Sequence, residues 1–267
     1  MKGLRSHPVR SHPVRCLPVR TPTLPPATHT NCYVLGPPEA LVVVDPASPW
    51  KEEQQALWAQ LQEMGRIAAI LLTHHHLDHV GGVQDLVART GAPVLAHPFT
   101  AERVDFAVDR LVQEGDLLAD WTLLHTPGHA TGHLCLWRPE SGELIAGDMV
   151  AGQGTIVLEP PEGNLADYLA SLERLAALEP EGVYPAHGPK LHAEVFGRYI
   201  AHRHARSAQI QAALSAKSQS ALDLVAQVYG DTIPKFVYPL AARQVRCHLH
   251  WLKARGQAQD TQAGWTA

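Results

Sequence analysis

A short apolar run from Ile67 to Leu72 ends abruptly in a group of imidazole and carboxylate side chains. The run is aliphatic, long enough for one buried strand and too short for most helices. The side chains that follow it are His74, His76, Asp78 and His79. A tight turn after a strand can direct alternate side chains toward one point, and imidazole and carboxylate are ligands that Zn²⁺ accepts. The stretch therefore predicts a metal site rather than a solvated histidine loop.

Three later motifs contain further candidate ligands, and together with the first they resemble a known family. They are Thr126-Pro127-Gly128-His129, Ala146-Gly147-Asp148 and Pro185-Ala186-His187-Gly188. With His74-x-His76-x-Asp78-His79, they follow the order found in the metallo-β-lactamase superfamily. The match runs from about Thr28 to the C-terminus. The resemblance implies an α/β fold class, an αββα metallo-β-lactamase sandwich, with a centre for one or two metal ions.

The resemblance also implies how seven side chains would share two ions. Carried over position by position, the ligands of the first ion are His74, His76 and His129. The ligands of the second ion are Asp78, His79 and His187, with Asp148 bridging both. We expect two Zn²⁺ per chain, although iron and manganese accept the same side chains. Two such ions about 3.5–4 Å apart share a hydroxide and lower its pKa toward neutrality. The predicted catalytic residues are two of the ligands, Asp78 and Asp148.

Several polar residues near these motifs are expected to support the site without binding metal. Asp45 stands where the family keeps a buried aspartate that orients the histidine loop. Thr73 is expected to form a hydrogen bond within that loop, and His75 to be structural. The remaining candidates, expected at the wall or rim of the cleft or behind the ligands, are His97, His125 and His133.

Hydrophobic periodicity and turn residues predict the order of the elements. Strands are expected at residues 28–36, 40–46, 67–72, 93–97, 134–137, 143–146 and 182–188, and a strand and loop at 154–163. Helices are expected at residues 51–64, 82–90 and 164–178, with Asn164 as the N-cap of the last. After residue 193 the pattern predicts helices to about 215, at 220–229 and at 239–254, then a small β-wing at 256–266. Three helices and a terminal hairpin are typical of a winged helix.

A near-repeat of five residues, with proline in every copy, occupies positions 6–20. Proline at this spacing disfavours a helix and regular β-sheet pairing, so we expect a flexible tail. The last copy of the repeat is expected to merge with the first strand. The predicted division is a flexible basic Pro-rich tail at 1–20, a metallo-β-lactamase-fold catalytic domain at 21–192, and a helical winged-helix-like domain at 193–267.

Charge is unevenly distributed along the chain. Residues 21–197 carry 8 basic and 23 acidic side chains, whereas residues 198–267 carry 9 basic and 3 acidic ones. A basic C-terminal unit beside an acidic core favours an anionic partner such as nucleic acid, although such faces are often only solvated. Residues expected to contact RNA are Arg243, Arg246 and Lys253.

Four scattered cysteines, none in a C-x-x-C motif, indicate free thiols in a reducing cytoplasm. The chain contains neither an apolar run long enough for a membrane span nor a secretory h-region. The expected partners are therefore a small-molecule ester or single-stranded nucleic acid, with no membrane. A homodimer remains open.

The leading hypothesis is a binuclear zinc hydrolase that cleaves a phosphodiester of single-stranded RNA, or a related ester, through a metal-bridging hydroxide. The chain resembles the β-lactamase-like protein 2 branch, whose characterised members include endoribonucleases. One alternative is a thioesterase similar to glyoxalase II (hydroxyacylglutathione hydrolase), whose seven ligands are the same. Another is a winged-helix nucleic-acid-binding protein with an inert core, and an iron-dependent oxidoreductase is a fourth. Antibiotic hydrolysis is disfavoured, because the commonest β-lactamases have cysteine in the place of Asp148.

Overall fold

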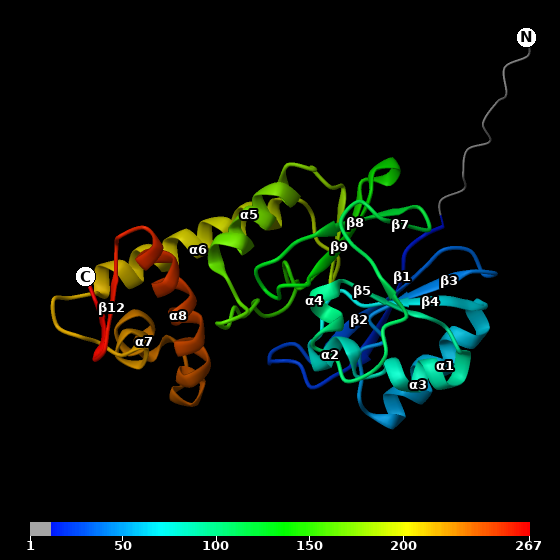
Figure 1. Cartoon of the computed structure of the whole chain (residues 1–267), viewed down its shortest axis with the longest axis horizontal. Helices are drawn as coiled ribbons and strands as arrows, with labels where there is room; N and C mark the ends of the chain where they lie inside the picture. Colours follow the sequence, from blue (N-terminus) through cyan, green and yellow to red (C-terminus); the bar gives the residue numbers. More distant parts are fainter. Residues whose placement is uncertain (1–11) are drawn as a thin grey trace, which may run out of the picture.

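Two β-sheets pack face to face at the centre of the larger part of the chain (Figure 1), in a computed structural model that describes residues 12–267. The first sheet, in spatial order, consists of β1 (Arg15–Arg20), β2 (His29–Leu35), β3 (Leu41–Val44), β4 (Ile67–Leu71), β5 (Val94–Ala96) and β6 (Arg110–Leu111). The second, in the order β11-β10-β9-β8-β7, consists of β7 (Leu117–Leu118), β8 (Trp121–His125), β9 (Leu134–Arg138), β10 (Glu143–Gly147) and β11 (Gly182–Pro185).

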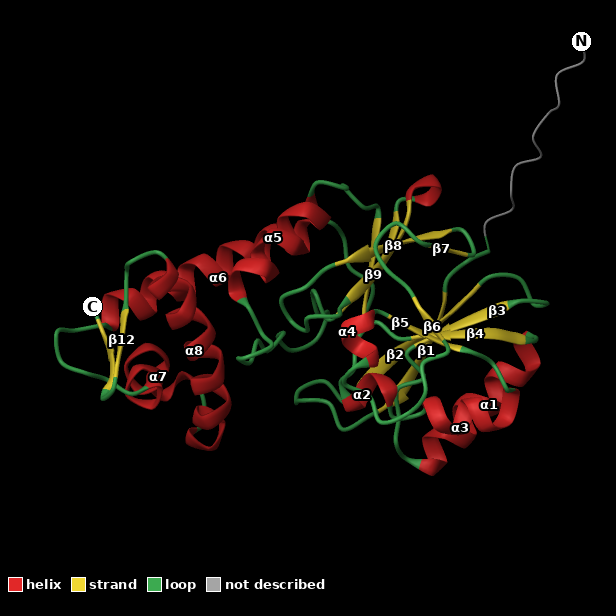
Figure 2. Ribbon diagram, in the orientation of Figure 1, coloured by secondary structure: helices red, strands yellow, loops and turns green. Residues whose placement is uncertain are grey.

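Helices cover the outer face of each sheet (Figure 2). The first sheet packs against α1 (Lys51–Met64) and α3 (Val83–Thr90) through a shared apolar cluster. The second packs against α5 (Leu165–Ala176) and the first turns of α6 (Glu194–Ala213). Shorter elements lie in the connections: α2 (Leu77–Val80), α4 (Pro98–Ala101) and the 3₁₀ turn η1 (Pro139–Ser141). The four layers confirm the αββα sandwich.

Side chains of the central strands are buried on both faces of the first sheet. In β2, Tyr33 and Leu35 pack between the two sheets, whereas Cys32 and Val34 pack toward α1 and α3. Strands covered on both faces contain nearly continuous apolar runs. This burial on both faces explains why apolar and polar residues do not alternate in the run from Ile67 to Leu72.

Most predicted elements are confirmed near their expected bounds. The helix at 51–64 is α1, Gly91 ends α3 in the left-handed conformation, and Asn164 caps α5 by accepting hydrogen bonds from the amides of Ala166 and Asp167. The strand expected within 154–163 is wrong, because this segment has no regular structure. Its apolar side chains Ile156 and Leu158 are buried against helices instead of pairing in a sheet.

Residues 15–20 form β1, so the last repeat copy lies in a strand, as expected, and the flexible tail predicted for residues 1–20 does not include it. β1 pairs with β2 in antiparallel register, and Leu17 and Val19 join the core cluster beneath α1. The proline between them, Pro18, is tolerated because β1 lies at the edge of the sheet. The first repeat copy, residues 6–10, lies outside the described residues.

The C-terminal region forms its own apolar cluster from α7 (Ala221–Tyr229), α8 (Tyr238–Ala254), the end of α6 and the hairpin of β12 (Gln259–Thr261) and β13 (Gly264–Thr266). Two 3₁₀ turns, η2 (Gly230–Thr232) and η3 (Lys235–Val237), join α7 to α8. This arrangement confirms the winged-helix prediction. Helix α6 contributes to both clusters, through Phe196 near its start and Ile210 near its end, and so links the two regions (Figure 1).

Within residues 12–267, none of the helices combines the length and apolarity that a membrane crossing requires. Of the four free cysteines, Cys32, Cys135 and Cys247 are buried, as expected of small apolar side chains, whereas Cys16 is exposed.

Candidate metal centre

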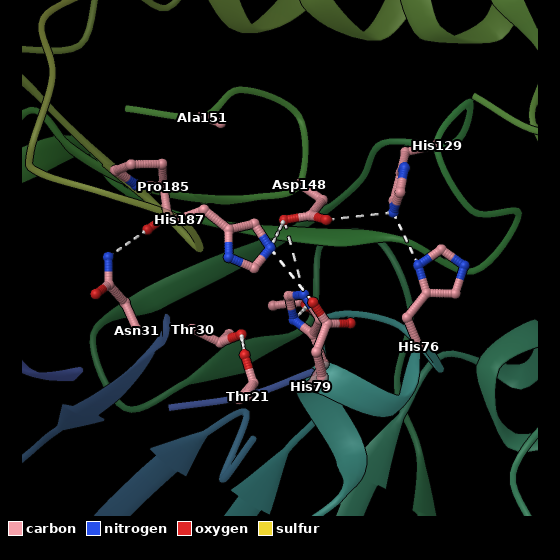
Figure 3. Close-up of polar contacts among 12 residues, drawn as sticks. Thr21, Thr30, Asn31, His76, His79, His129, Asp148, Ala151, Pro185 and His187 are labelled. Carbon is pink, nitrogen blue, oxygen red and sulfur yellow. Dashed lines mark hydrogen bonds and ion pairs between the residues drawn. The ribbon is translucent and has the colours of Figure 1, made fainter. Parts of the chain in front are cut away.

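The seven predicted ligands form one cluster of side chains. Figure 3 labels five of them: His76, His79, His129, Asp148 and His187. Four of the seven follow the end of β4 directly. His129 lies in the loop between β8 and β9, Asp148 follows β10, and His187 follows β11. Both sheets therefore contribute ligands to the cluster, although these ligands are far apart in the sequence.

The first group consists of three imidazoles whose ring nitrogens point at one another. His76 Nδ1 lies 3.0 Å from His74 Nε2 and 3.0 Å from His129 Nε2, and those two Nε2 atoms are 3.3 Å apart. A tetrahedral zinc site with Zn–N bonds of about 2.0–2.1 Å has ligand nitrogens about 3.3 Å apart. The spacing fits a metal ion of that size.

The outer hydrogen bonds of two rings determine which nitrogens carry protons. His129 Nδ1 donates to the Val157 carbonyl at 2.8 Å, because a carbonyl only accepts. Thr73 donates its hydroxyl proton to Asp45 and accepts from His74 Nδ1 at 3.0 Å. In the neutral rings both Nε2 atoms then carry lone pairs that face each other. Such an arrangement favours a cation between them.

The second group consists of Asp78, His79 and His187. His187 Nδ1 donates to the His29 carbonyl at 3.0 Å, so its Nε2 is free to face Asp78 Oδ2 at 3.6 Å. His79 Nδ1 contacts Asp45 Oδ2 at 2.8 Å, and its buried Nε2 has no hydrogen-bond partner among the described residues. A buried ring nitrogen without a partner is uncommon and fits a metal ligand.

Asp148 lies between the two groups, as Figure 3 shows. Its Oδ2 is 3.4 Å from His129 Nε2, and its Oδ1 is 3.3 Å from His187 Nε2 and 3.7 Å from His79 Nε2. Each oxygen thus faces a different group, which is the position a bridging carboxylate requires. The whole His/Asp cluster fits a dinuclear metal site.

Burial and the carboxylates divide the histidines into two electrostatic classes. Burial, followed by neighbouring imidazoles, lowers the pKa of His76 to about 3 and the pKa of His74 well below its usual value. Burial also disfavours the charged form of His79, but Asp148 and the other nearby carboxylates outweigh it and raise the pKa of His79. Although burial raises the pKa of Asp148, the charges of His187 and His79 hold it well below its usual range. Neutral imidazoles and an ionised carboxylate are the forms that bind divalent metals.

The backbone after β10 is shaped to place Asp148. Its amide donates to His133 Nε2 at 3.0 Å, and His133 Nδ1 contacts the Thr126 hydroxyl at 2.8 Å. Gly147 has a φ of 50°, and a Cβ there would lie 2.5 Å from His133 Nε2. Glycine is therefore required, and His133 lies behind the ligands as predicted.

The histidine loop is held by Asp45, which is only 3 % exposed. One of its oxygens accepts from the Thr73 amide at 2.8 Å, and the other lies 2.6 Å from the Thr73 hydroxyl and 2.8 Å from His79 Nδ1. This places Asp45 and Thr73 as the sequence predicts.

The other histidines lie outside both groups. His75 Nε2 contacts Glu162 at 3.1 Å, and Glu162 also accepts from the amide and hydroxyl of Thr131. His97 and His125 stack on each other with ring centroids 4.2 Å apart. Glu162 has no sequence motif that would have identified it in advance.

The irregular segment behind His129 is held by the C-terminal helices. Arg203 of α6 donates to the Ile156 carbonyl at 2.6 Å, and Gln244 of α8 accepts from the Leu158 amide at 2.8 Å. Val157, between them, accepts from His129. Gln244 and Leu158 are 86 residues apart, so no local pattern could have revealed this support.

A cavity of about 460 Å³ opens onto both groups. Five predicted ligands line it: His76, Asp78, His129, Asp148 and His187. Among the described lining residues, the only arginine or lysine is Arg243 of α8, which pairs with Glu159 at 2.9 Å. The winged-helix region thus forms part of the cavity wall.

Two family models match this chain. Residues 25–187 match the metallo-beta-lactamase superfamily, and residues 220–265 match the beta-lactamase associated winged helix domain. The chain belongs to the metallo-beta-lactamase superfamily. Members of this superfamily are generally hydrolases, and this member combines the catalytic fold with the winged helix.

Individual relatives agree with this assignment. A beta-lactamase-like protein 2 homolog of Drosophila melanogaster is 33 % identical over 85 % of this chain and 83 % of its own length. An atrochrysone carboxyl ACP thioesterase of Passalora fulva is 30 % identical over 76 % of this chain and 64 % of its own. The crystal structure of a metallo-beta-lactamase family protein from Thermus thermophilus superposes with a TM-score of 0.79 and 25 % identity, covering 94 % of this chain and 97 % of that one.

Proposed function

We propose that this superfamily member is a binuclear zinc-dependent hydrolase that cleaves phosphodiester bonds of single-stranded RNA. The observation that carries the proposal is Arg243, a cation of the winged-helix region that lines the same cavity as the predicted metal ligands. Its guanidinium suits a phosphate because it offers several N–H donors in a planar fork. An RNA strand with one phosphate at Arg243 would place another of its phosphates beside the metal centre.

The roles of this chain's residues follow from their positions. The two histidine groups would hold two divalent ions, with Asp148 between them. When bound, such ions lower the pKa of a water molecule and neutralise charge on the attacked group. Asp78 and Asp148 keep the cavity negative and so retain the cations, and Arg243 orients the anionic substrate at the wall. Arg243 is exposed and paired with Glu159, so exchanging that carboxylate for a phosphate breaks no buried contact.

A thioesterase is the second candidate, because the Passalora fulva relative is named as an ACP thioesterase. Thioester substrates carried on phosphorylated cofactors are also anionic, so Arg243 by itself does not separate the two functions.

A substrate panel separates them. The purified full chain is loaded with Zn²⁺, Mn²⁺ or Fe²⁺, its ion content is measured, and it is assayed with a single-stranded RNA oligomer, S-lactoylglutathione, an acyl-ACP and bis(p-nitrophenyl) phosphate. We expect two ions per chain and metal-dependent cleavage of RNA, with zinc active. Hydrolysis of the thioesters without RNA cleavage would reject the phosphodiesterase in favour of the thioesterase.

Arg243→Gln should raise KM for RNA more than it lowers kcat, because Arg243 binds substrate rather than metal.

A further inference from the structure

A second cavity, of about 590 Å³, lies beside the metal cavity. Pro160 and Pro161 line both, so one loop separates the two spaces. The far wall is α8 and the near wall is the first turn of α5, which lie next to each other (Figure 1). The α8 residues that line it are Arg246, Cys247, His250, Trp251 and Ala254, with Arg255 just after the helix.

The charge of this second cavity is opposite to that of the first. No carboxylate is found among its lining residues in the described part of the chain, whereas four line the metal cavity: Asp78, Asp148, Glu159 and Glu162. Arg246 and Arg255 both line it, and neither forms an ion pair within residues 12–267. The neighbouring cations Arg243 and Lys253 are paired, with Glu159 and Asp260 respectively.

The two unpaired arginines differ in their surroundings. Arg255 lies over the ring of Trp251, with its guanidinium carbon 4.1 Å from the ring centroid, which restrains it at the cavity wall. Arg246 is half-buried and lies three residues after Arg243, on the same face of α8. At about 1.5 Å per residue, the line from Arg243 to Arg255 extends about 18 Å. A stacked single strand places about five phosphates along that length.

We propose that the second cavity binds the sugar–phosphate backbone of a single-stranded RNA whose scissile bond lies in the metal cavity, with Arg246 and Arg255 contacting phosphates. The strand passes Pro160 and Pro161 and meets Arg243 at the entrance to the metal cavity. This assignment rests on the proposed function for the position of the scissile bond. It also narrows the RNA contacts expected from the sequence, because Lys253 is paired and does not line either cavity.

Binding of a fluorescent single-stranded RNA oligomer by the metal-loaded full chain tests the assignment. Arg246→Gln/Arg255→Gln should weaken binding roughly tenfold and make the slope of log K against log salt shallower by about 1.4, since each single-strand phosphate contact contributes about 0.7. The matched control is Lys217→Gln/Lys235→Gln, which removes the same charge from exposed positions that line neither cavity. The control should bind within about twofold of the unmodified chain. Metal content and circular dichroism of each variant establish that the fold and the centre are intact.

Equal weakening by both double variants would show that only overall charge matters and would overturn the assignment, as would no weakening by either. The proposed function fails separately. RNA that is bound through Arg246 and Arg255 but never cleaved would reject the phosphodiesterase and retain the binding site. RNA that is cleaved normally and bound equally well by the Arg246/Arg255 variant would retain the phosphodiesterase and reject the site.

Discussion

The two sides of the metal centre are supported in different ways. On the side of His79, the support is Asp45, which follows β3 directly and contacts His79 Nδ1; Thr73 links Asp45 to His74 of the other group. On the side of His129, the support is the Val157 carbonyl, in a segment without regular structure. The first arrangement depends on the sheet, and the second depends on side chains from α6 and α8.

This difference gives the C-terminal helices a structural part in the candidate metal centre. Arg203 is only 2 % exposed and has no carboxylate partner among the described residues; it donates to Ile156 and lies over the ring of Tyr168. A buried guanidinium without a counter-ion is costly unless its contacts are well formed. The segment that orients His129 is therefore held by contacts that the sandwich alone does not provide.

The largest effect is expected where both sides meet. Asp148→Ala should lower hydrolysis roughly a thousandfold or more and reduce the bound metal below two ions, because one carboxylate faces both groups. Thermal unfolding should remain cooperative, since the sandwich packs without it. Kinetics, ion content and calorimetry measure these quantities. A variant that unfolds but hydrolyses normally per folded molecule would instead make Asp148 structural.

Asp45→Asn should be the next most damaging change. It removes the charge that orients His79 while keeping the side chain's shape, and such supporting contacts typically contribute ten- to a hundredfold in metal affinity. We expect selective weakening of the ion on the His79 side, measured by competition with a chelating dye. Equal weakening of both ions would contradict the separate support of the two sides.

Gln244→Leu should weaken the other ion, by about tenfold, because the Leu158 amide loses its acceptor and the segment behind His129 loosens. Gln244→Glu retains an acceptor oxygen and should restore most of the affinity. Hydrogen exchange of residues 154–163 provides a reading that does not depend on metal. If Gln244→Glu is as defective as Gln244→Leu, the contact with Leu158 is not what supports His129.

The smallest effect is expected from Glu162, which joins the histidine loop to the loop after His129 through His75 and Thr131. Burial opposes its ionisation, but the hydrogen bonds from His75 and Thr131 outweigh it and lower the pKa of Glu162 to about 2. Because the pKa is depressed in the folded chain, the stabilisation is complete above the unfolded value of about 4.3 and is lost as pH falls toward 2. In metal-free protein, Glu162→Gln should flatten the dependence of Tm on pH between about 5 and 2. An unchanged dependence would show that Glu162 does not stabilise the fold through its charge.

The sequence determined the fold class and predicted most residues of the candidate site. The apolar run before His74, the helix that ends at Gly65 and the cap at Asn164 are local patterns, and local patterns report backbone geometry and burial directly. The resemblance supplied the seven ligands, because each lies in a short motif at the end of a strand.

Only the tertiary structure decided how those ligands are held and what lies beside them. Ile156 to Leu158 reads as a strand because its side chains are apolar, yet it has no strand neighbour and is fixed by Arg203 and Gln244. The sequence predicted Arg246 as an RNA contact, but not the cavity that Arg246 lines together with Arg255, because that cavity depends on which residues the fold brings together. Contacts between residues far apart in sequence leave no periodic pattern in the sequence. Each contact needs only one suitable residue at one position in each of the two segments.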